Sequence, residues 1–169
     1  MKCAVCGGDC VDEACYLFVL PIYASMPPKE FRKRVQASSD QCIVDDKHFF
    51  ILGNLDIPVL DTELKIRYSL WSSLSEANFL RATALWEREG RESEPPYFGW
   101  LANQIPGYED PWSIQLNVHT QPVGIRPLIE VIEEGHPLWR DQREGISLDR
   151  YYELCHIARL TFPGKAAPH

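Results

Sequence analysis

The chain has 169 residues, of which 45% are hydrophobic and 24% are charged. These proportions are typical of one globular domain and exclude whole-chain disorder, collagen and coiled coil. No apolar stretch reaches the roughly 18 residues that a membrane span needs, and the net charge of -7 argues against binding to nucleic acid or anionic membranes, which requires a basic surface. We expect a single domain over residues 1–162 and a flexible tail over 163–169.

The first fifteen residues are rich in cysteine and predict a zinc-binding knuckle. The segment begins without an apolar secretory signal, so we expect a cytoplasmic protein whose thiols stay reduced. Zinc takes four ligands in a tetrahedron, and a Cys-x2-Cys turn followed by glycine directs two thiolates at one point. The predicted structural Zn²⁺ site consists of Cys3, Cys6, Cys10 and Cys42, with Cys15 as the alternative fourth ligand. Unliganded thiols and redox chemistry are the other interpretations.

An extended segment over 17–22 is expected to lead into a helix that starts near Pro28, because proline suits the first turn of a helix. Basic side chains crowd this helix, and we interpret them as a solvated face, with ligand binding as the alternative. Apolar residues at 42–44 and 48–52 flank the polar step 45–47. This pattern predicts a β-hairpin.

A strand and then a helix are expected in the middle of the chain. Ile66, Tyr68 and Leu70 alternate with polar residues, so one face of this strand should be buried. Ser73 and Glu76 have the spacing of a capping box and predict the start of the helix. Its expected apolar face consists of Ala77, Leu80, Ala84 and Leu85, widened by Phe79 and Trp86, and its expected end lies near Gly90.

Two more strands are expected over 114–120 and 128–132. A polar loop then leads to Ser147, which can cap a last helix with Cys155 in its buried stripe. Strands cluster in the middle of the chain, and two of them alternate cleanly between apolar and polar residues. We therefore predict an α+β fold with a mainly antiparallel sheet and helices packed on one side.

Aromatic residues are concentrated in a region with few signals of regular structure. Aromatic side chains on loops are typical anchors of protein interfaces, although filling a core is their other common role. The candidate binding residues are Tyr97, Trp100, Tyr108 and Trp112. We expect Phe98 to be buried and at least one of Tyr97, Tyr108 and Trp112 to be exposed.

One histidine and one carboxylate offer an alternative site of acid–base chemistry. His136 and Glu144 are near each other in the sequence and can in principle act as base and orienter. The other interpretation is a loop held by side-chain hydrogen bonds. The sequence has no nucleophile motif, no phosphate-binding glycine loop and no dinucleotide fingerprint, so nothing else marks an active site.

Several short segments along the chain carry a family resemblance when they are taken in order. They are Cys3 to Cys6, Ser39-Asp40-Gln41-Cys42-Ile43, His48-Phe49-Phe50-Ile51, Leu55-Asp56-Ile57-Pro58-Val59, Trp71-Ser72-Ser73-Leu74-Ser75, Pro96-Tyr97-Phe98-Gly99-Trp100-Leu101, and His136-Pro137-Leu138 with Gln142-Arg143-Glu144-Gly145-Ile146. In this order they resemble the bacterial family catalogued as domain of unknown function 2199. The resemblance implies a bacterial, cytoplasmic protein and supplies no activity. Cys10 stands where the family has a histidine, and the family's Asp-x-Cys motif matches residues 40–42, which favours Cys42 over Cys15.

These observations together predict a non-catalytic, zinc-stabilised cytoplasmic domain that binds another protein. The acidic net charge suits a basic partner, as for an immunity or inhibitor protein that neutralises a basic toxin. The alternative is a small metal-dependent or acid–base hydrolase that uses His136 and Glu144. A closed site of four thiolates would favour binding, because it leaves no open position for a zinc-bound water.

Overall fold

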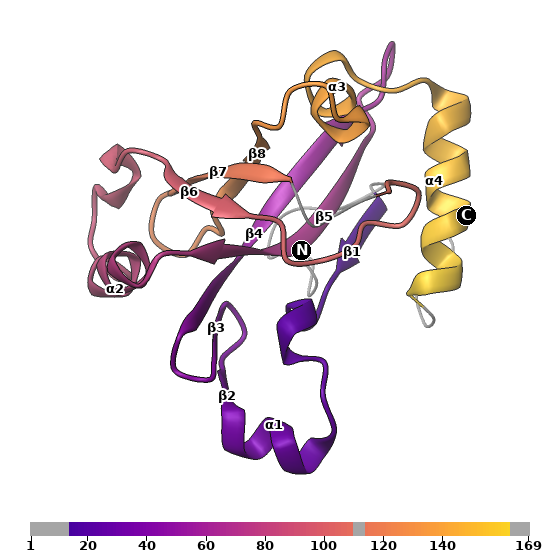
Figure 1. Ribbon diagram of the computed structural model, residues 1–169. Helices are drawn as coiled ribbons and strands as arrows, with labels where there is room; N and C mark the ends of the chain where they lie inside the picture. Colours follow the sequence, from indigo (N-terminus) through magenta and orange to yellow (C-terminus); the bar gives the residue numbers. More distant parts are fainter. Residues whose placement is uncertain (1–13, 110–113, 163–169) are drawn as a thin grey trace.

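The computed structural model describes residues 14–109 and 114–162. Over these residues the chain has a mixed α+β fold with one mostly antiparallel sheet and four α-helices (Figure 1). The strands are β1 (Ala14–Leu17), β2 (Val35–Ala37), β3 (Gln41–Val44), β4 (His48–Pro58), β5 (Lys65–Leu74), β6 (Tyr97–Trp100), β7 (Gln115–His119) and β8 (Leu128–Val131). The helices are α1 (Pro28–Arg34), α2 (Glu76–Ala84), α3 (Pro137–Glu144) and α4 (Leu148–Thr161), with short 3-10 turns η1 (Ile22–Ala24) and η2 (Arg91–Ser93).

The long hairpin of β4 and β5 forms the centre of the sheet, whose strand order is β1-β5-β4-β8-β7-β6. β3 pairs with β4 and β2 pairs with β3, which builds a small arm that carries α1 at its tip (Figure 1). β1 joins β5 in parallel, and Asn54 opposite Leu128 is the parallel pair between β4 and β8. The other pairings are antiparallel, so the prediction of a mainly antiparallel sheet is confirmed.

Helices cover both faces of this sheet, whereas the sequence predicted one. The larger core includes Leu55 of β4, and α2, α3 and α4 pack against it. The smaller core, on the other face, includes Phe50 and Trp71 and is covered by η1 and α1. β4 begins with an unbroken run of apolar residues, so large apolar side chains lie on both faces of the sheet. Other elements must therefore cover both faces to keep these side chains from water.

The expected hairpin is present, and its turn uses Asp45 and Asp46 in the left-handed region. The helix after β5 starts later than predicted, because Ser75 and not Ser73 caps it by accepting from the Asn78 N–H. Phe79 is buried, as its place on the widened apolar face predicted, whereas Leu80 is exposed. The helix also ends at Ala84, before the expected stop near Gly90.

The carboxyl-terminal region contains one expected and one unexpected helix. α4 starts where predicted, with Ser147 accepting from the Arg150 N–H, and Cys155 is buried in its stripe as expected. α3 occupies the segment that was predicted to be a loop, and His136 caps it directly before Pro137. Within residues 14–109 and 114–162, no helix combines the length and the apolar composition that crossing a membrane requires.

Candidate functional site

The predicted zinc ligands are only partly visible, because Cys3, Cys6 and Cys10 lie outside the described residues. Cys42 is a free thiol, fully buried in the smaller core beside Phe50. Burial raises the pKa of this thiol to about 11, which favours the neutral form over the thiolate that zinc needs. Among the described residues, no three His, Cys, Asp or Glu side chains are grouped as metal ligands.

The two alternatives for the fourth ligand lie far apart on the sheet. Cys42 is opposite Phe50, whereas Cys15 is beside Arg67, which is itself opposite Asp56. Phe50 and Asp56 are six positions apart on β4, so the two cysteines are separated by roughly 20 Å along the strands. Sulfurs on one zinc ion are roughly 4 Å apart, so Cys15 and Cys42 cannot bind the same ion. Cys15 is disulfide-bonded.

The prediction that Phe98 is buried is wrong, and two of the candidate anchors, Tyr97 and Tyr108, are buried. Phe98 and Trp100 are 45% and 41% exposed, whereas Tyr97 and Tyr108 are buried. The Tyr97 hydroxyl donates to Glu94 at 2.7 Å, and the Tyr108 hydroxyl donates to Asp141 at 2.7 Å. Residues 97–100 form a strand with alternating faces, a possibility that the loop interpretation left out. The fourth candidate, Trp112, lies outside the described residues.

Trp100 lines a groove of about 370 Å³ that we call the aromatic groove. Its walls come from η1, the start of β4 and the ends of β5 and β6, and they include Tyr23, Lys47, His48, Phe50, Ser73 and Trp100. The Tyr23 ring lies 5.5 Å from His48 and 5.3 Å from Phe50 between ring centroids, and 47% of Tyr23 remains exposed. Phe98 contacts Trp100 edge-on at 5.5 Å and extends the aromatic surface beyond the groove.

Backbone hydrogen bonds hold the walls of the aromatic groove together. The Ile22 N–H donates to the Ala102 carbonyl, and the Ala102 N–H donates to the Trp71 carbonyl, each at 2.9 Å. The Trp100 N–H donates to the Ser73 hydroxyl, also at 2.9 Å. Gly99 permits this close approach, because a Cβ there would overlap the Ser73 carbonyl oxygen. The groove is therefore formed by the fold itself and needs no rearrangement to accept a ligand.

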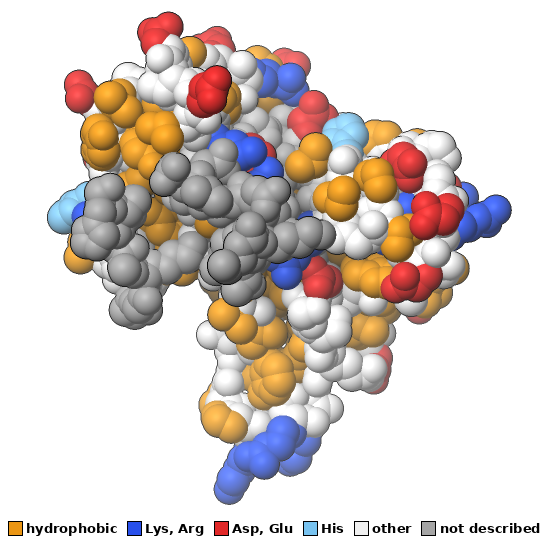
Figure 2. All heavy atoms as spheres, turned by 180° about the vertical axis from the view of Figure 1, so that it is seen from behind, with side chains coloured by type: hydrophobic (Ala, Val, Ile, Leu, Met, Phe, Trp, Pro, Cys, Tyr) orange, Lys and Arg blue, Asp and Glu red, His pale blue; other side chains and the backbone are white. Residues whose placement is uncertain are grey.

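The charges near the aromatic groove are mostly positive, in contrast to the net charge of the chain. Lys47 lines the groove itself. α1 carries four basic residues and one acidic residue, and Arg34 forms an ion pair with Asp45 at 2.7 Å. Lys and Arg side chains gather at the tip of the arm (Figure 2). A partner at this edge of the molecule thus meets a locally basic surface.

The structure does not bring His136 and Glu144 together. They stand at opposite ends of α3, which separates them by roughly 12 Å along the helix axis. The Leu138 N–H donates to Nδ1 of His136, so the ring hydrogen is on Nε2, which lies 3.0 Å from the Glu109 carbonyl oxygen. Glu144 is exposed. His136 is thus a helix cap, and the hydrogen-bonded interpretation of this segment holds.

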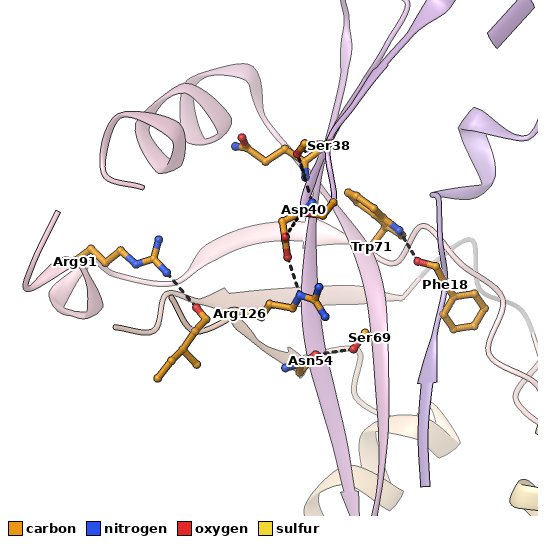
Figure 3. A network of polar contacts seen from close by, with 11 residues as sticks. Phe18, Ser38, Asp40, Asn54, Ser69, Trp71, Arg91 and Arg126 are labelled. Atoms are coloured by element: carbon orange, nitrogen blue, oxygen red, sulfur yellow. Dashed lines mark hydrogen bonds and ion pairs between the residues drawn. The ribbon is translucent and has the colours of Figure 1, made fainter. Parts of the chain in front are cut away.

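A polar network that the sequence did not predict joins distant segments beside β4 (Figure 3). The Arg126 Nε donates to the Asp40 carboxylate at 2.6 Å, although the two residues are 86 positions apart. Nearby, the Ser69 hydroxyl donates to the Asn54 amide oxygen at 2.7 Å. Both Asp40 and Arg126 line a cavity of about 420 Å³. The signal that could have directed attention here is the Asp-x-Cys motif, which contains Asp40 but does not reveal its partner.

The sequence was compared with known families, curated proteins and solved structures. The sequence model of one family, described as an uncharacterized protein conserved in bacteria (DUF2199), matches residues 2–146. The chain belongs to this family. No curated protein and no solved structure matches it.

The match to DUF2199 covers all strands and helices α1 to α3 and ends before α4. It therefore includes the aromatic groove, the Asp40–Arg126 pair and the predicted zinc ligands. In this DUF2199 protein the two ends of the Asp-x-Cys motif have different surroundings: Asp40 pairs with Arg126, and Cys42 is buried in the smaller core. The family description names no substrate or partner, so the geometry carries the functional argument.

Proposed function

We propose that this DUF2199 protein is a non-catalytic binding protein that recognises a protein partner through the aromatic groove. The observation that carries this proposal is the exposure of Tyr23 and Trp100 on two walls of one preformed groove, with Phe98 beside it. Aromatic side chains dominate the binding energy of many protein interfaces. A rigid groove adds to affinity because little conformational entropy is lost on binding.

The partner that fits this groove is an acidic segment with an apolar or aromatic anchor residue. A volume of about 370 Å³ accommodates one or two side chains of a partner. Lys47 and the basic residues of α1 then attract carboxylates on either side of the anchor. The net charge of -7 by itself favours a basic partner. The charges local to the groove favour an acidic partner instead, and we base the proposal on these local charges.

Zinc binding in the cytoplasm remains part of the proposal for the amino-terminal segment. We infer that, in the reduced protein, Cys3, Cys6 and Cys10 bind a structural Zn²⁺ with Cys15 as the fourth ligand. This choice rests on the apolar, fully buried setting of Cys42 and on its distance from Cys15. The disulfide at Cys15 must be reduced before Cys15 can bind zinc as a thiolate.

Photo-cross-linking in a native bacterial host tests the binding function. A photoreactive phenylalanine analogue replaces Trp100 in one strain and Tyr152, an exposed aromatic residue of α4, in a control strain. We expect a discrete protein adduct from position 100 and none from position 152. With the purified partner, Trp100→Ala should weaken binding by a factor of about ten or more, as interface anchors do, and Tyr152→Ala should not.

Two results contradict this function. The first is the absence of an adduct at position 100 while the variant protein is folded and abundant. The second is a partner whose affinity is the same for the wild type and for Trp100→Ala.

Rising salt should also weaken binding, since ions screen the attraction between Lys47 and an acidic partner.

A further inference from the structure

The cavity beside Asp40 lies at the edge of β4, where the segment that is hydrogen-bonded to β4 changes from the one containing Asp40 to the one containing Pro127. The Leu52 N–H donates to the Asp40 carbonyl at 2.9 Å, whereas the Asn54 N–H donates to the Pro127 carbonyl at 2.8 Å. The two segments diverge from these points, and the Arg126–Asp40 ion pair links them (Figure 3). The cavity has a volume of about 420 Å³, which falls within the range of roughly 300–1,000 Å³ typical of small-molecule sites.

One wall of the cavity holds a buried positive charge that no described carboxylate neutralises. Arg91 is 8% exposed, and its guanidinium donates to four backbone carbonyl oxygens at 2.8–3.2 Å. Carbonyl dipoles satisfy these N–H groups but leave the full charge in place. The other two arginines of the wall differ, because Arg126 faces Asp40 and Arg67 faces Asp56. The cavity therefore carries a positive potential that is strong at low dielectric.

The remaining walls are largely apolar and include Leu85, Trp86 and Ile125. We propose that this cavity binds a small organic anion, a monocarboxylate with an apolar body. The carboxylate faces the arginine side, where it balances the charge of Arg91, and the body packs against the apolar side chains. This site is separate from the aromatic groove, which is lined by other residues, and it does not depend on the protein-binding proposal.

Backbone NMR of the full chain titrated with phenylacetate and with its uncharged analogue phenylacetamide tests the proposal. We expect saturable shifts with phenylacetate at the amides of Thr120, Gly124 and Ile125, which line the cavity. Phenylacetamide should bind weaker by a factor of about ten or more, because hydrogen bonds and ion contacts to a charged group are the stronger ones. Inorganic phosphate should bind more weakly than phenylacetate, since it has no apolar body.

Two pairs of variants locate the binding. Ala82→Trp fills the cavity from α2 and should abolish the shifts, whereas Ala84→Trp on the exposed face of the same helix should preserve them. Ile125→Asp places a negative charge in a half-exposed loop position, where it does not threaten the fold. It should weaken phenylacetate binding by a factor of about ten and leave phenylacetamide unaffected. Leu160→Asp, on exposed α4, is its control.

Four results would overturn the assignment. They are equal affinity for phenylacetate and phenylacetamide, phosphate binding as tight as that of phenylacetate, undiminished binding to Ala82→Trp, and the absence of any saturable shift. Shifts confined to the aromatic groove would equally contradict it, because they would assign the carboxylate to the other site.

Discussion

Cys42 and Cys155 are the free cysteines of the described chain, and both are buried. The pKa of Cys42 is raised because its thiolate would lie among apolar side chains. A raised pKa stabilises the fold below the ordinary thiol pKa, and this contribution is lost as the pH rises through about 11. Cys42 therefore contributes to the fold as a neutral thiol over the physiological range.

Cysteine-to-serine variants separate a core role from a ligand role. In reduced, zinc-replete preparations we expect about one zinc per chain in the wild type, in Cys42→Ser and in Cys155→Ser, but none in Cys15→Ser. Cys42→Ser should still lower the free energy of unfolding by about 1–3 kcal/mol, because it buries a hydroxyl among apolar groups. Elemental analysis and urea unfolding provide the two measurements. Zinc lost from Cys42→Ser alone would restore Cys42 as the fourth ligand.

At the scale of elements, the close crossing of β6 over the end of β5 determines the aromatic groove. β6 also pairs with β7, so its outward side chains are fixed in one register. Gly99 stands at the contact, with the Ser73 carbonyl where a side chain would be. Trp100 can therefore take its position over the groove only because the residue before it, Gly99, has no side chain.

Gly99→Ala should lower the free energy of unfolding by about 1–3 kcal/mol, because the added methyl group forces β6 away from β5. The same change should weaken partner binding, since it moves Trp100. Phe98→Ala is the matched control on the adjacent, exposed position and should cost less than about 1 kcal/mol. Urea unfolding measures both variants. Equal stability of Gly99→Ala and the wild type would show that β6 can move without cost.

At the scale of the whole molecule, surface ion pairs join segments that are separate in the sequence. Arg34, at the end of α1, forms an ion pair with Asp45 in the turn between β3 and β4. Arg81 of α2 forms an ion pair with Glu94, which precedes β6. The arginines donate to these carboxylates and keep the pKa of Asp45 and of Glu94 below their ordinary values. Because the unfolded chain binds these protons more readily, both pairs contribute stability above the ordinary carboxyl pKa values and lose it as the pH falls.

Stability should therefore decline on acidification below about pH 5. Arg81→Met removes one of the two contributions and should flatten this decline, while Arg159→Met should leave it unchanged. Arg159 is exposed on α4 and forms no ion pair with any residue in the described ranges. Urea unfolding between pH 3 and about pH 7 measures the slope. A slope that is the same for Arg81→Met and the wild type would contradict the role of Glu94.

Local sequence patterns predicted much of this fold, but not its pairings. The alternation at Ile66, Tyr68 and Leu70 and the cap at Ser147 are local signals, and both are confirmed. α3 was missed because it is short and polar, although a histidine before Pro137 fits a helix start. The sequence does not show which of Tyr97 and Phe98 is buried, because both are aromatic. Only the register of β6 decides which side chain faces the core.

The sites depended on contacts that no local pattern reveals. Asp40 and Arg126 meet across 86 positions, and the aromatic groove combines η1 with the ends of three strands. The net charge of -7 averages over the whole surface, so it does not reveal the basic side chains that α1 carries. The sequence indicated Trp100 as a candidate binding residue, and it is exposed in the structure, but its neighbours Tyr23 and His48 became visible only when the fold brought them together.

The parallel edge of the sheet constrains the order in which a nascent chain can fold. Ala14 of β1 lies opposite Ile66 of β5, which the ribosome adds 52 residues later. The arm from η1 to the start of β4 pairs mostly with its sequence neighbours and can form as soon as it emerges. β1 can pair only after β5 has been synthesised, and until then Tyr16, which is buried in the folded protein, is exposed to solvent. Vectorial synthesis therefore favours formation of the arm before β1, the first strand of the described residues, can pair with β5.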